Sequence, residues 1–176
     1  MNVTVLYESI YGNTAAIADA IASGIHAKAG AEVDLHPVGG RFVPTDLLVL
    51  GAPTHAHGLP SSMSRKGLEK AAAEKEANGE ALEYHPTAGM RQFIDELPPG
   101  AGSPVACFDT RFDRSAVLTG SAAKTMARKL RRHGYTVVGE PESFFVSDAE
   151  GPLLPGELER ATRWGAALVG ALERVG

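Results

Sequence analysis

The sequence holds one cysteine, few aromatic residues and no long apolar run. With Cys107 as the only cysteine among 176 residues, the chain can form no internal disulfide and no metal site made of several thiolates. Its apolar runs are much shorter than the roughly 20 residues that a membrane-spanning helix needs. The N-terminus also lacks the basic and apolar regions of a secretory signal. We therefore expect a cytoplasmic protein without a membrane span.

An excess of positive charge is also missing. The 17 lysines and arginines are outnumbered by 21 aspartates and glutamates, which gives a formal net charge of −4. No basic stripe is interleaved with aromatic residues, so the usual footprint of a nucleic-acid-binding protein is absent and we expect no nucleic-acid partner. The hydrophobic content of 44% is enough for a full core, and we expect one domain over residues 1–176.

What the sequence does contain is an alternation of apolar runs and helical patterns. Five runs predict strands, at Asn2–Tyr7, Glu32–Pro37, Asp46–Leu50, Pro104–Phe108 and Tyr135–Val146. The third and fourth runs are continuously apolar, which is typical of strands covered on both faces. Apolar residues recur at helical spacing in three other segments, at Ile17, Ile21 and Ile25, at Ala122, Met126 and Leu130, and at Leu158, Ala161, Leu168, Leu172 and Val175. This alternation predicts an α/β fold with an open, doubly wound, mainly parallel sheet.

The ends of the predicted helices carry the expected residue types. Thr14 and Ser121 are predicted to start helices, because their hydroxyls can accept from free N–H groups of the first turn. Gly30 and Gly134 follow helical patterns where a left-handed cap is expected.

Two connections depart from the regular alternation. The stretch GGRFVPT, between the second and third strands, is too short for a crossover helix and predicts a loop or a single turn. The connection between the third and fourth strands is long and contains residues 64–78, which are charged and rich in alanine. These residues predict a helix within an insertion at about residues 62–86, and the pattern TAGMRQFIDEL predicts a second helix after it.

The stretch YESIYGNT, residues 7–14, follows the first strand and leads directly into a helical pattern. In an open parallel sheet, ligands bind at the carboxyl ends of the strands. The backbone N–H groups of this loop, the positive end of the next helix and the side chains of Ser9, Asn13 and Thr14 suit an oxygen-rich anion. Gly12 allows a positive φ or a close approach of the ligand. The alternative is a plain turn with one hydroxyl cap, which leaves the other polar residues unexplained.

The motifs of other known phosphate-binding loops do not occur in this sequence. Neither G-x-x-x-x-G-K-[ST] nor G-x-G-x-x-G occurs. The third strand ends LGAPT without a carboxylate, so a phosphoacceptor receiver domain is set aside. A phosphatase of this topology would carry its cysteine in the first loop, whereas Cys107 lies in PVACFD, where a small buried residue is expected.

Three segments together resemble the ligand loops of the flavodoxin family. YESIYGNT, DLLVLGAPTHAHG and VACFDTRF follow the first, third and fourth predicted strands in the order found in that family. The resemblance implies a five-stranded parallel sheet in the order 2-1-3-4-5, bound FMN and electron transfer. By position, it implies that the FMN phosphate is held by Ser9, Ile10, Tyr11, Gly12, Asn13 and Thr14. It places the flavin ring between Pro53, Thr54, His55, Ala56, His57 and Gly58 on one side and Asp109, Thr110, Arg111 and Phe112 on the other.

The chain departs from the family in its aromatic residues. Flavodoxins usually set a tryptophan or tyrosine against the flavin, whereas the third-strand loop here offers only His55 and His57. Either histidine can stack on the flavin as a flat ring or simply be exposed to solvent. Trp164 lies beside the apolar stripe of the last helix, where we expect it to pack in the core. In the family a peptide of the third-strand loop changes its hydrogen bonding when the flavin is half reduced. Gly58, or the peptide between His57 and Gly58, is the position expected to do so, and the alternative is a glycine needed only for the turn.

Arg111 has two possible roles. It can lie near the flavin and favour the negatively charged reduced form, or it can pair with Asp109 or Asp113 and point to solvent.

Three functional hypotheses remain open. The first is an electron carrier between a reductase and an acceptor protein, and the second is a two-electron enzyme, similar to flavodoxin-like quinone reductases, that uses NAD(P)H. The third is a flavodoxin-like binding module without flavin. Carriers of the family usually have a strongly acidic face, whereas Asp109 and Asp113 alternate here with Arg111 and Arg114, which weakens the carrier hypothesis. In the two redox hypotheses the flavin supplies the chemistry, so we expect no catalytic side chain and no metal.

Deleting residues 64–85 should leave FMN bound, because the predicted contacts with FMN all lie outside this segment. The affinity can be measured by titrating the flavin-free deletion variant with FMN and following the flavin fluorescence. A folded deletion variant that no longer binds FMN would contradict this prediction. The rate of acceptor reduction by the same variant then shows whether the insertion covers the flavin or is a solvated surface helix.

Overall fold

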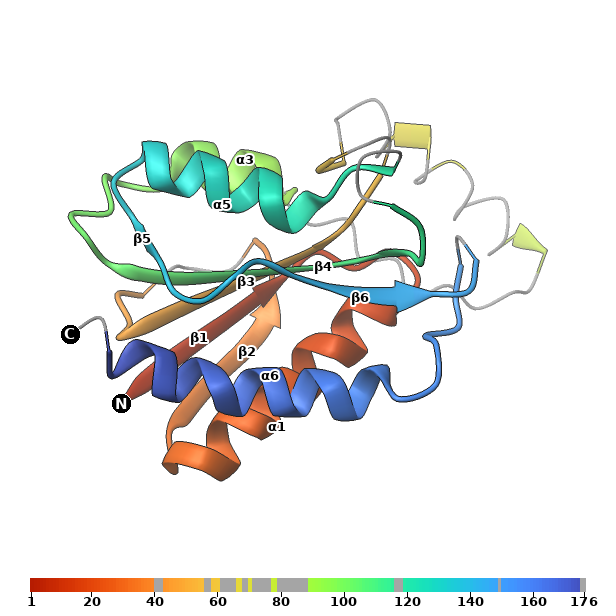
Figure 1. Cartoon of the computed structure of the whole chain (residues 1–176). Helices are drawn as coiled ribbons and strands as arrows, with labels where there is room; N and C mark the ends of the chain where they lie inside the picture. Colours follow the sequence, from red (N-terminus) through yellow and green to blue (C-terminus); the bar gives the residue numbers. More distant parts are fainter. Residues whose placement is uncertain are drawn as a thin grey trace.

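Figure 1 shows the computed structural model as a twisted parallel sheet with helices on both faces. The structure describes residues 1–39, 43–55, 58–60, 66–67, 70, 77–78, 89–115, 119–148 and 150–174. The strands are β1 (Asn2–Tyr7), β2 (Glu32–Pro37), β3 (Leu47–Pro53), β4 (Pro104–Phe112), β5 (Thr136–Val137) and β6 (Glu142–Val146). The helices are α1 (Asn13–Ala29), α3 (Met90–Glu96), α5 (Ala122–Arg132) and α6 (Glu157–Leu172).

The strands follow the order β2-β1-β3-β4-β5, and all neighbours are parallel. The doubly wound α/β fold and the order 2-1-3-4-5 are therefore confirmed. The predicted last strand, Tyr135–Val146, is however divided into β5 and β6, which both pair with β4 at different points along it. Two residues explain the break, because Gly139 has a φ of 68° and Pro141 has no N–H to donate to the ladder.

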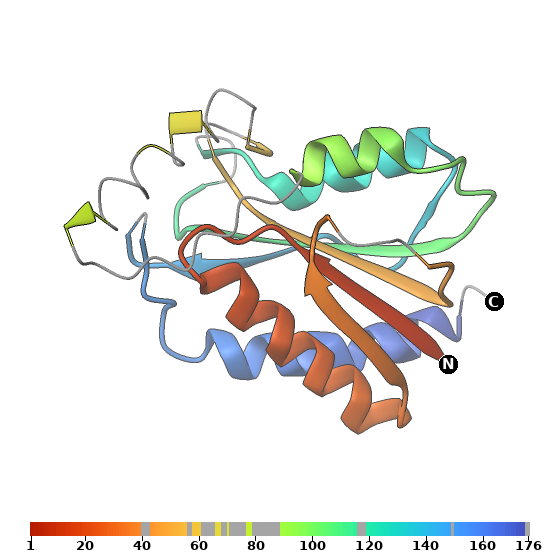
Figure 2. The ribbon, with the colours of Figure 1, turned by 180° about the vertical axis from the view of Figure 1, so that it is seen from behind.

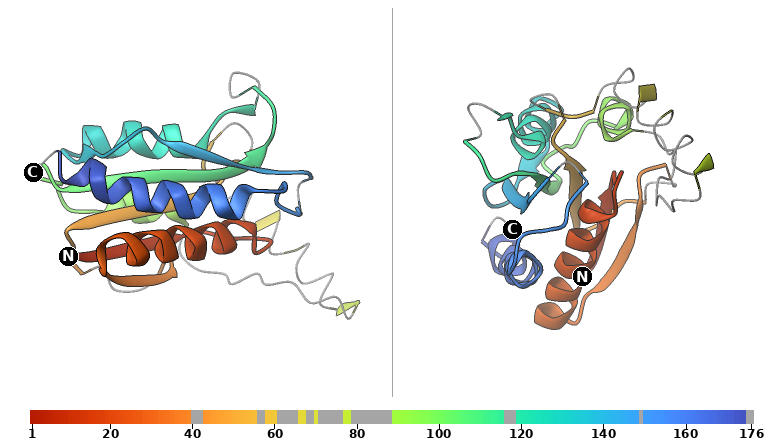
Figure 3. Two further views of the ribbon diagram at one scale, coloured as in Figure 1. Left: turned by 60° about the horizontal axis from the view of Figure 1, so that its bottom comes forward. Right: turned by 90° about the vertical axis from the view of Figure 1, so that its right-hand side faces the viewer.

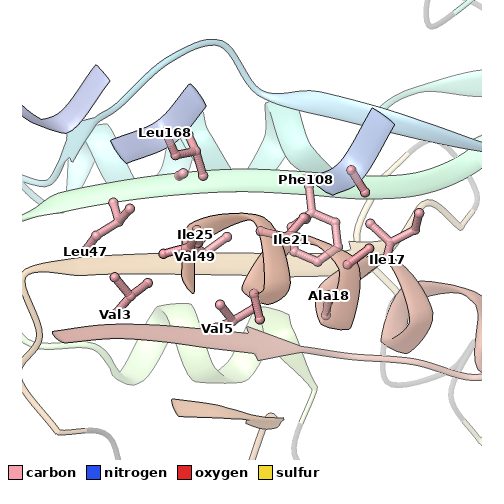
Figure 4. Close-up of a cluster of buried hydrophobic side chains, with 14 of the residues drawn as sticks. Val3, Val5, Ile17, Ala18, Ile21, Ile25, Leu47, Val49, Phe108 and Leu168 are labelled. Carbon is pink, nitrogen blue, oxygen red and sulfur yellow. The ribbon is translucent and has the colours of Figure 1, made fainter. Parts of the chain in front are cut away.

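Each face of the sheet carries its own apolar cluster. Helices α1 and α6 cover one face, and α3 and α5 cover the other (Figures 1 and 2). Alternate residues of the strands point to opposite faces, as the period of a strand requires. Figure 4 shows the cluster against α1 and α6, which contains Val3, Val5, Leu47, Val49 and Phe108. The other cluster includes Leu6, Leu48, Leu50, Val105, Cys107, Met90 and Met126.

The aromatic side chains in the core pack edge to face. Trp164 of α6 is partly buried, and its ring centroid lies 6.2 Å from that of Phe108 and 6.1 Å from that of Phe144. This arrangement confirms the expectation that Trp164 packs in the core.

Most of the predicted helix ends are confirmed. Ser121 caps α5, and its Oγ accepts from the N–H of Lys124 at 3.1 Å. Gly30 ends α1 with a φ of 56°, and Gly134 follows α5 with a φ of 84°. The predicted start at Thr14 is wrong, because Gly12 is the N-cap of α1 and Thr14 lies inside the first turn.

The two irregular connections are described only in part. Between β2 and β3, residues 38–39 and 43–46 contain no helix, in agreement with the predicted loop, and residues 40–42 lie outside the described residues. Most of the predicted insertion at residues 62–86 also lies outside them. The helix predicted from TAGMRQFIDEL is present as α3. No helix in the described part of the chain has the length and apolar character needed to cross a membrane.

Helices α1 and α6 run beside each other and touch through their backbones (Figure 3). A Cβ atom added at Gly24 of α1 would lie 2.0 Å from the carbonyl oxygen of Thr162. A Cβ atom added at Gly165 of α6 would lie 2.3 Å from the carbonyl oxygen of Ile21. Both glycines are therefore required by the close approach of the two helices.

Replacing Gly165 by alanine should destabilise the protein, because the methyl group forces the two helices apart. Overpacking of this kind typically costs about 1–3 kcal/mol in the free energy of unfolding. Gly170→Ala in the same helix is the matched control, since its added Cβ would meet only Arg174 Nη1, at 3.8 Å. We expect this control to be as stable as the wild type or slightly more stable, because alanine favours a helix. Urea unfolding of both variants measures the difference, and equal midpoints would contradict the prediction.

Candidate functional site

The loops that follow β1, β3 and β4 meet at the edge of the sheet where these parallel strands have their carboxyl ends. A hollow lies between them, lined by Ile10, Tyr11, Asn13, Thr14, Pro53, Thr54, His55, Thr110, Arg111, Phe112 and Val146. All of these residues except Val146 belong to the set predicted from the sequence. Of the other predicted residues, Ser9, Gly12, Gly58 and Asp109 do not line the hollow, and Ala56 and His57 lie outside the described residues.

The backbone of the first loop presents a run of free donors. Gly12, the N-cap residue of α1, has a left-handed φ of 78° and makes no side-chain cap hydrogen bond. Within the part of the chain that the structure describes, none of the N–H groups of residues 9–14 donates a hydrogen bond. These groups lie at the positive end of a helix of 17 residues. This arrangement is suited to an anion with several oxygen atoms.

The polar side chains of the first loop connect it to other segments. Ser9 Oγ accepts from the N–H of Ala15 at 3.3 Å and so joins the loop to the first turn of α1. The buried hydroxyls of Thr14 and Thr110 share a hydrogen bond of 2.8 Å, which connects the loop to β4. Asn13 Nδ2 donates to the carbonyl oxygen of Glu150 at 3.0 Å. The loop is thus held on three sides while its N–H groups remain available.

Asp109 of β4 is fully buried and faces the start of α5. Its Oδ2 accepts from the hydroxyl of Thr54 at 3.0 Å, from that of Ser121 at 2.6 Å and from the N–H of Ala123 at 2.9 Å. The alternation of β4 explains this direction, because Asp109 shares the face of Cys107 whereas Thr110 shares that of Phe108.

Arg111 is nearly buried, with 10% of its side chain exposed. Its Nη1 donates to the carbonyl oxygens of Phe112 and Arg114 and to the hydroxyl of Thr119. Its guanidinium lies over the ring of Phe145, with Cζ 5.0 Å from the centroid. Its Nε is 4.0 Å from Asp109 Oδ1, and neither of these two buried atoms has a hydrogen-bond partner among the described residues. The expected pairing with Asp109 is therefore present, but the side chain does not point to solvent.

Two described residues of the third-strand loop, His55 and Gly58, are paired through their backbones. The N–H of His55 donates to the carbonyl oxygen of Gly58 at 2.8 Å, and the N–H of Gly58 donates back to that of His55 at 3.0 Å. His55 is exposed and lines the hollow. A change in hydrogen bonding at Gly58, as expected from the sequence, would have to break one of these two bonds. Phe112, which also lines the hollow, is 40% exposed and offers an aromatic ring.

Two residues that support the site were not found from the sequence. Glu8 is only 6% exposed, and its Oε2 accepts from the N–H of Met90, the first residue of α3, at 2.9 Å. Arg91 Nη2 donates to the carbonyl oxygen of Leu59 at 2.8 Å. The start of α3 is thus joined to the first and third loops. The only signal for Glu8 was its position inside YESIYGNT. A carboxylate next to a loop suited to an anion needs a hydrogen-bond donor of its own.

Cys107 takes no part in the site. It is buried in β4, and burial raises the pKa of its thiol well above the usual value, so the thiol stays protonated. This confirms the expectation of a small buried residue. Among the described residues, no three histidine, cysteine, aspartate or glutamate side chains are grouped so that they could hold a metal ion.

Comparisons with known proteins confirm the resemblance to flavodoxins. Residues 4–66 match the family model described as a flavodoxin domain, and no curated protein matches the sequence significantly. A point mutant of a flavodoxin from Pseudomonas aeruginosa is 19% identical, with a TM-score of 0.63 over 98% of this chain and 99% of the other. A flavodoxin from the domain Archaea is 20% identical, with a TM-score of 0.59 over 98% and 99%. A flavodoxin, WrbA-like protein from Agrobacterium tumefaciens is 18% identical, with a TM-score of 0.56 over 99% of both chains.

Proposed function

We propose that this chain, which is flavodoxin-like in sequence over residues 4–66 and in fold over its whole length, binds FMN and transfers electrons. One observation carries the proposal. Six consecutive N–H groups without an acceptor among the described residues lie at the start of α1, beside a hollow whose other walls come from β3 and β4. Free N–H groups at the positive end of a helix attract negatively charged oxygen atoms, so such a run favours a bound anion.

The residues around the hollow fit FMN. The loop of residues 9–14 would hold the phosphate through its N–H groups, with the hydroxyls of Ser9 and Thr14 close by. Pro53, Thr54 and His55 would bind one side of the ring, and Thr110, Arg111 and Phe112 would bind the other. The chain has one phosphate-type loop and no dinucleotide fingerprint, which favours FMN over FAD or a nicotinamide cofactor. When bound, FMN supplies the redox chemistry, and these residues orient it and exclude water from it.

The charge around the hollow keeps a second function open. Asp113 and Arg114 are both exposed next to Phe112, and Arg111 is one of the residues that line the hollow. This mixed charge differs from the acidic face expected of a carrier that docks a basic partner protein. The second candidate is therefore an oxidoreductase that accepts two electrons from NAD(P)H and passes them to a quinone or a similar acceptor.

Changing both Ser9 and Thr14 to alanine should weaken FMN binding. The loss should be about 1–3 kcal/mol, the range for buried polar groups left without partners. Ser23→Ala is the control, since Ser23 is an exposed residue of α1 outside the loop. Fluorescence titration with FMN gives the affinities, and thermal unfolding without FMN separates a loss of binding from a loss of fold. Equal FMN affinity in the double variant and the wild type would contradict the predicted role of this loop.

Reduction under anaerobic conditions distinguishes the candidate functions. For a carrier, NADPH or NADH alone should leave the visible absorbance of the bound flavin unchanged over minutes, while dithionite should bleach it. Rapid bleaching by either nicotinamide, followed by recovery on addition of a quinone, would instead support the oxidoreductase. A purified protein that is colourless and does not take up added FMN would support the binding module without flavin.

A further inference from the structure

Two opposite charges lie side by side at the end of β4. Asp109 and Arg111 are two residues apart in the strand and therefore lie on the same face of the sheet. The carboxylate is fully buried, the guanidinium is 10% exposed, and Oδ1 and Nε are 4.0 Å apart. Burial of a single charge is unfavourable, so each of these groups depends on the other.

The carboxylate of Asp109 holds the third-strand loop. Its Oδ2 accepts from Thr54 Oγ1, and Thr54 Oγ1 accepts in turn from the N–H of Ala122, at 2.8 Å. The backbone N–H of Thr54 also donates to the carbonyl oxygen of Thr110, at 2.8 Å. Together these bonds hold Thr54 against β4 and the start of α5. One wall of the hollow is thus positioned by Asp109.

The guanidinium of Arg111 holds the opposite wall. Its Nη1 donates to the carbonyl oxygens of Phe112 and Arg114, and so holds the turn of residues 112–114 at the end of β4, and it also donates to the hydroxyl of Thr119. Phe112 is the exposed aromatic residue of this turn. The Asp109 and Arg111 pair therefore connects both loops that flank the hollow.

We propose that Asp109 is a positioning residue that fixes the third-strand loop beside the flavin and balances the positive charge of Arg111, and that the pair thereby sets the reduction potential of the flavin. The inference rests on the proposed function, because it takes the hollow as the FMN site. Reduction adds negative charge to the flavin. A carboxylate near the ring therefore lowers the reduction potential and a guanidinium raises it, so that in the intact pair the two effects largely cancel.

The test uses variants of matched size. Asp109→Asn removes the negative charge and should raise the potential of the FMN-loaded protein, whereas Arg111→Gln should lower it. We expect each single variant to change the ratio of reduced to oxidised flavin about tenfold at a fixed applied potential, equivalent to 59 mV for a one-electron couple. The double variant should return close to the wild type. Asp113→Asn is the control, because this exposed carboxylate in the same turn is screened by solvent.

Potentials are measured by titration against redox dyes, after the FMN affinity of each variant has been determined. Potential shifts of opposite sign in the two single variants support the inference. If the substitutions only loosened the loops, the direction of the shift would not depend on whether a negative or a positive charge had been removed. Potentials that agree among all variants, with FMN still bound, would overturn the inference and leave the proposed function intact. If the wild type does not bind FMN, the proposed function fails instead.

Two further variants keep the test decisive if Asp109→Asn does not fold. Arg111→Lys keeps the charge but loses the planar group that bonds the turn, so it should retain the wild-type potential while Arg111→Gln does not. Equal potentials in these two variants would also overturn the inference. Thermal unfolding of the flavin-free protein tests the structural part, because Thr54→Val should lower the melting temperature more than Asp113→Asn does. Equal melting temperatures would exclude the role of Asp109 in holding this loop.

Discussion

Strand β4 is constrained on every side, and the rest of the structure is arranged around it. One of its edges pairs with β3, and the other pairs first with β5 and then with β6. Its faces are covered by α1 and α6 on one side and by α3 and α5 on the other (Figure 1). Every side chain from Val105 to Thr110 is therefore buried. A polar residue in this strand must find its partner inside the protein, because water cannot reach it.

The hydroxyl of Thr110 and Oδ2 of Asp109, at the end of β4, meet this requirement by bonding to residues around the hollow. Thr110 points to the α1 side and bonds the hydroxyl of Thr14, while Asp109 points to the α5 side and bonds Thr54 and Ser121. The same strand thus orients the first loop from one face and the third loop from the other. Loops that are already held by such bonds lose less entropy when a ligand binds.

Much of this arrangement could be predicted because it depends on local patterns. The buried runs of β3 and β4 identify strands covered on both faces, and YESIYGNT combines hydroxyls, an amide and a glycine before a helix. The break at Gly139–Pro141 was missed because the apolar residues on both sides of it read as one strand. The direction of Asp109 and the bond from Glu8 to Met90 depend on which segments meet in three dimensions. Sequence spacing carries no information on such contacts between distant residues.

The close approach of Gly24 of α1 to Thr162, and of Gly165 of α6 to Ile21, joins the first and last helices that the structure describes. A ribosome makes α1 long before α6, so the nascent α1 has no helical neighbour on this side while the intervening strands emerge. The loop of residues 9–14 leads directly into α1, and the hollow also needs Val146, which precedes α6 by only a few residues. Contacts this distant along the chain form late in folding. The edge of the sheet that carries the hollow is therefore completed only after β6 has been made, and a chain that stops before α6 would expose the apolar side of α1.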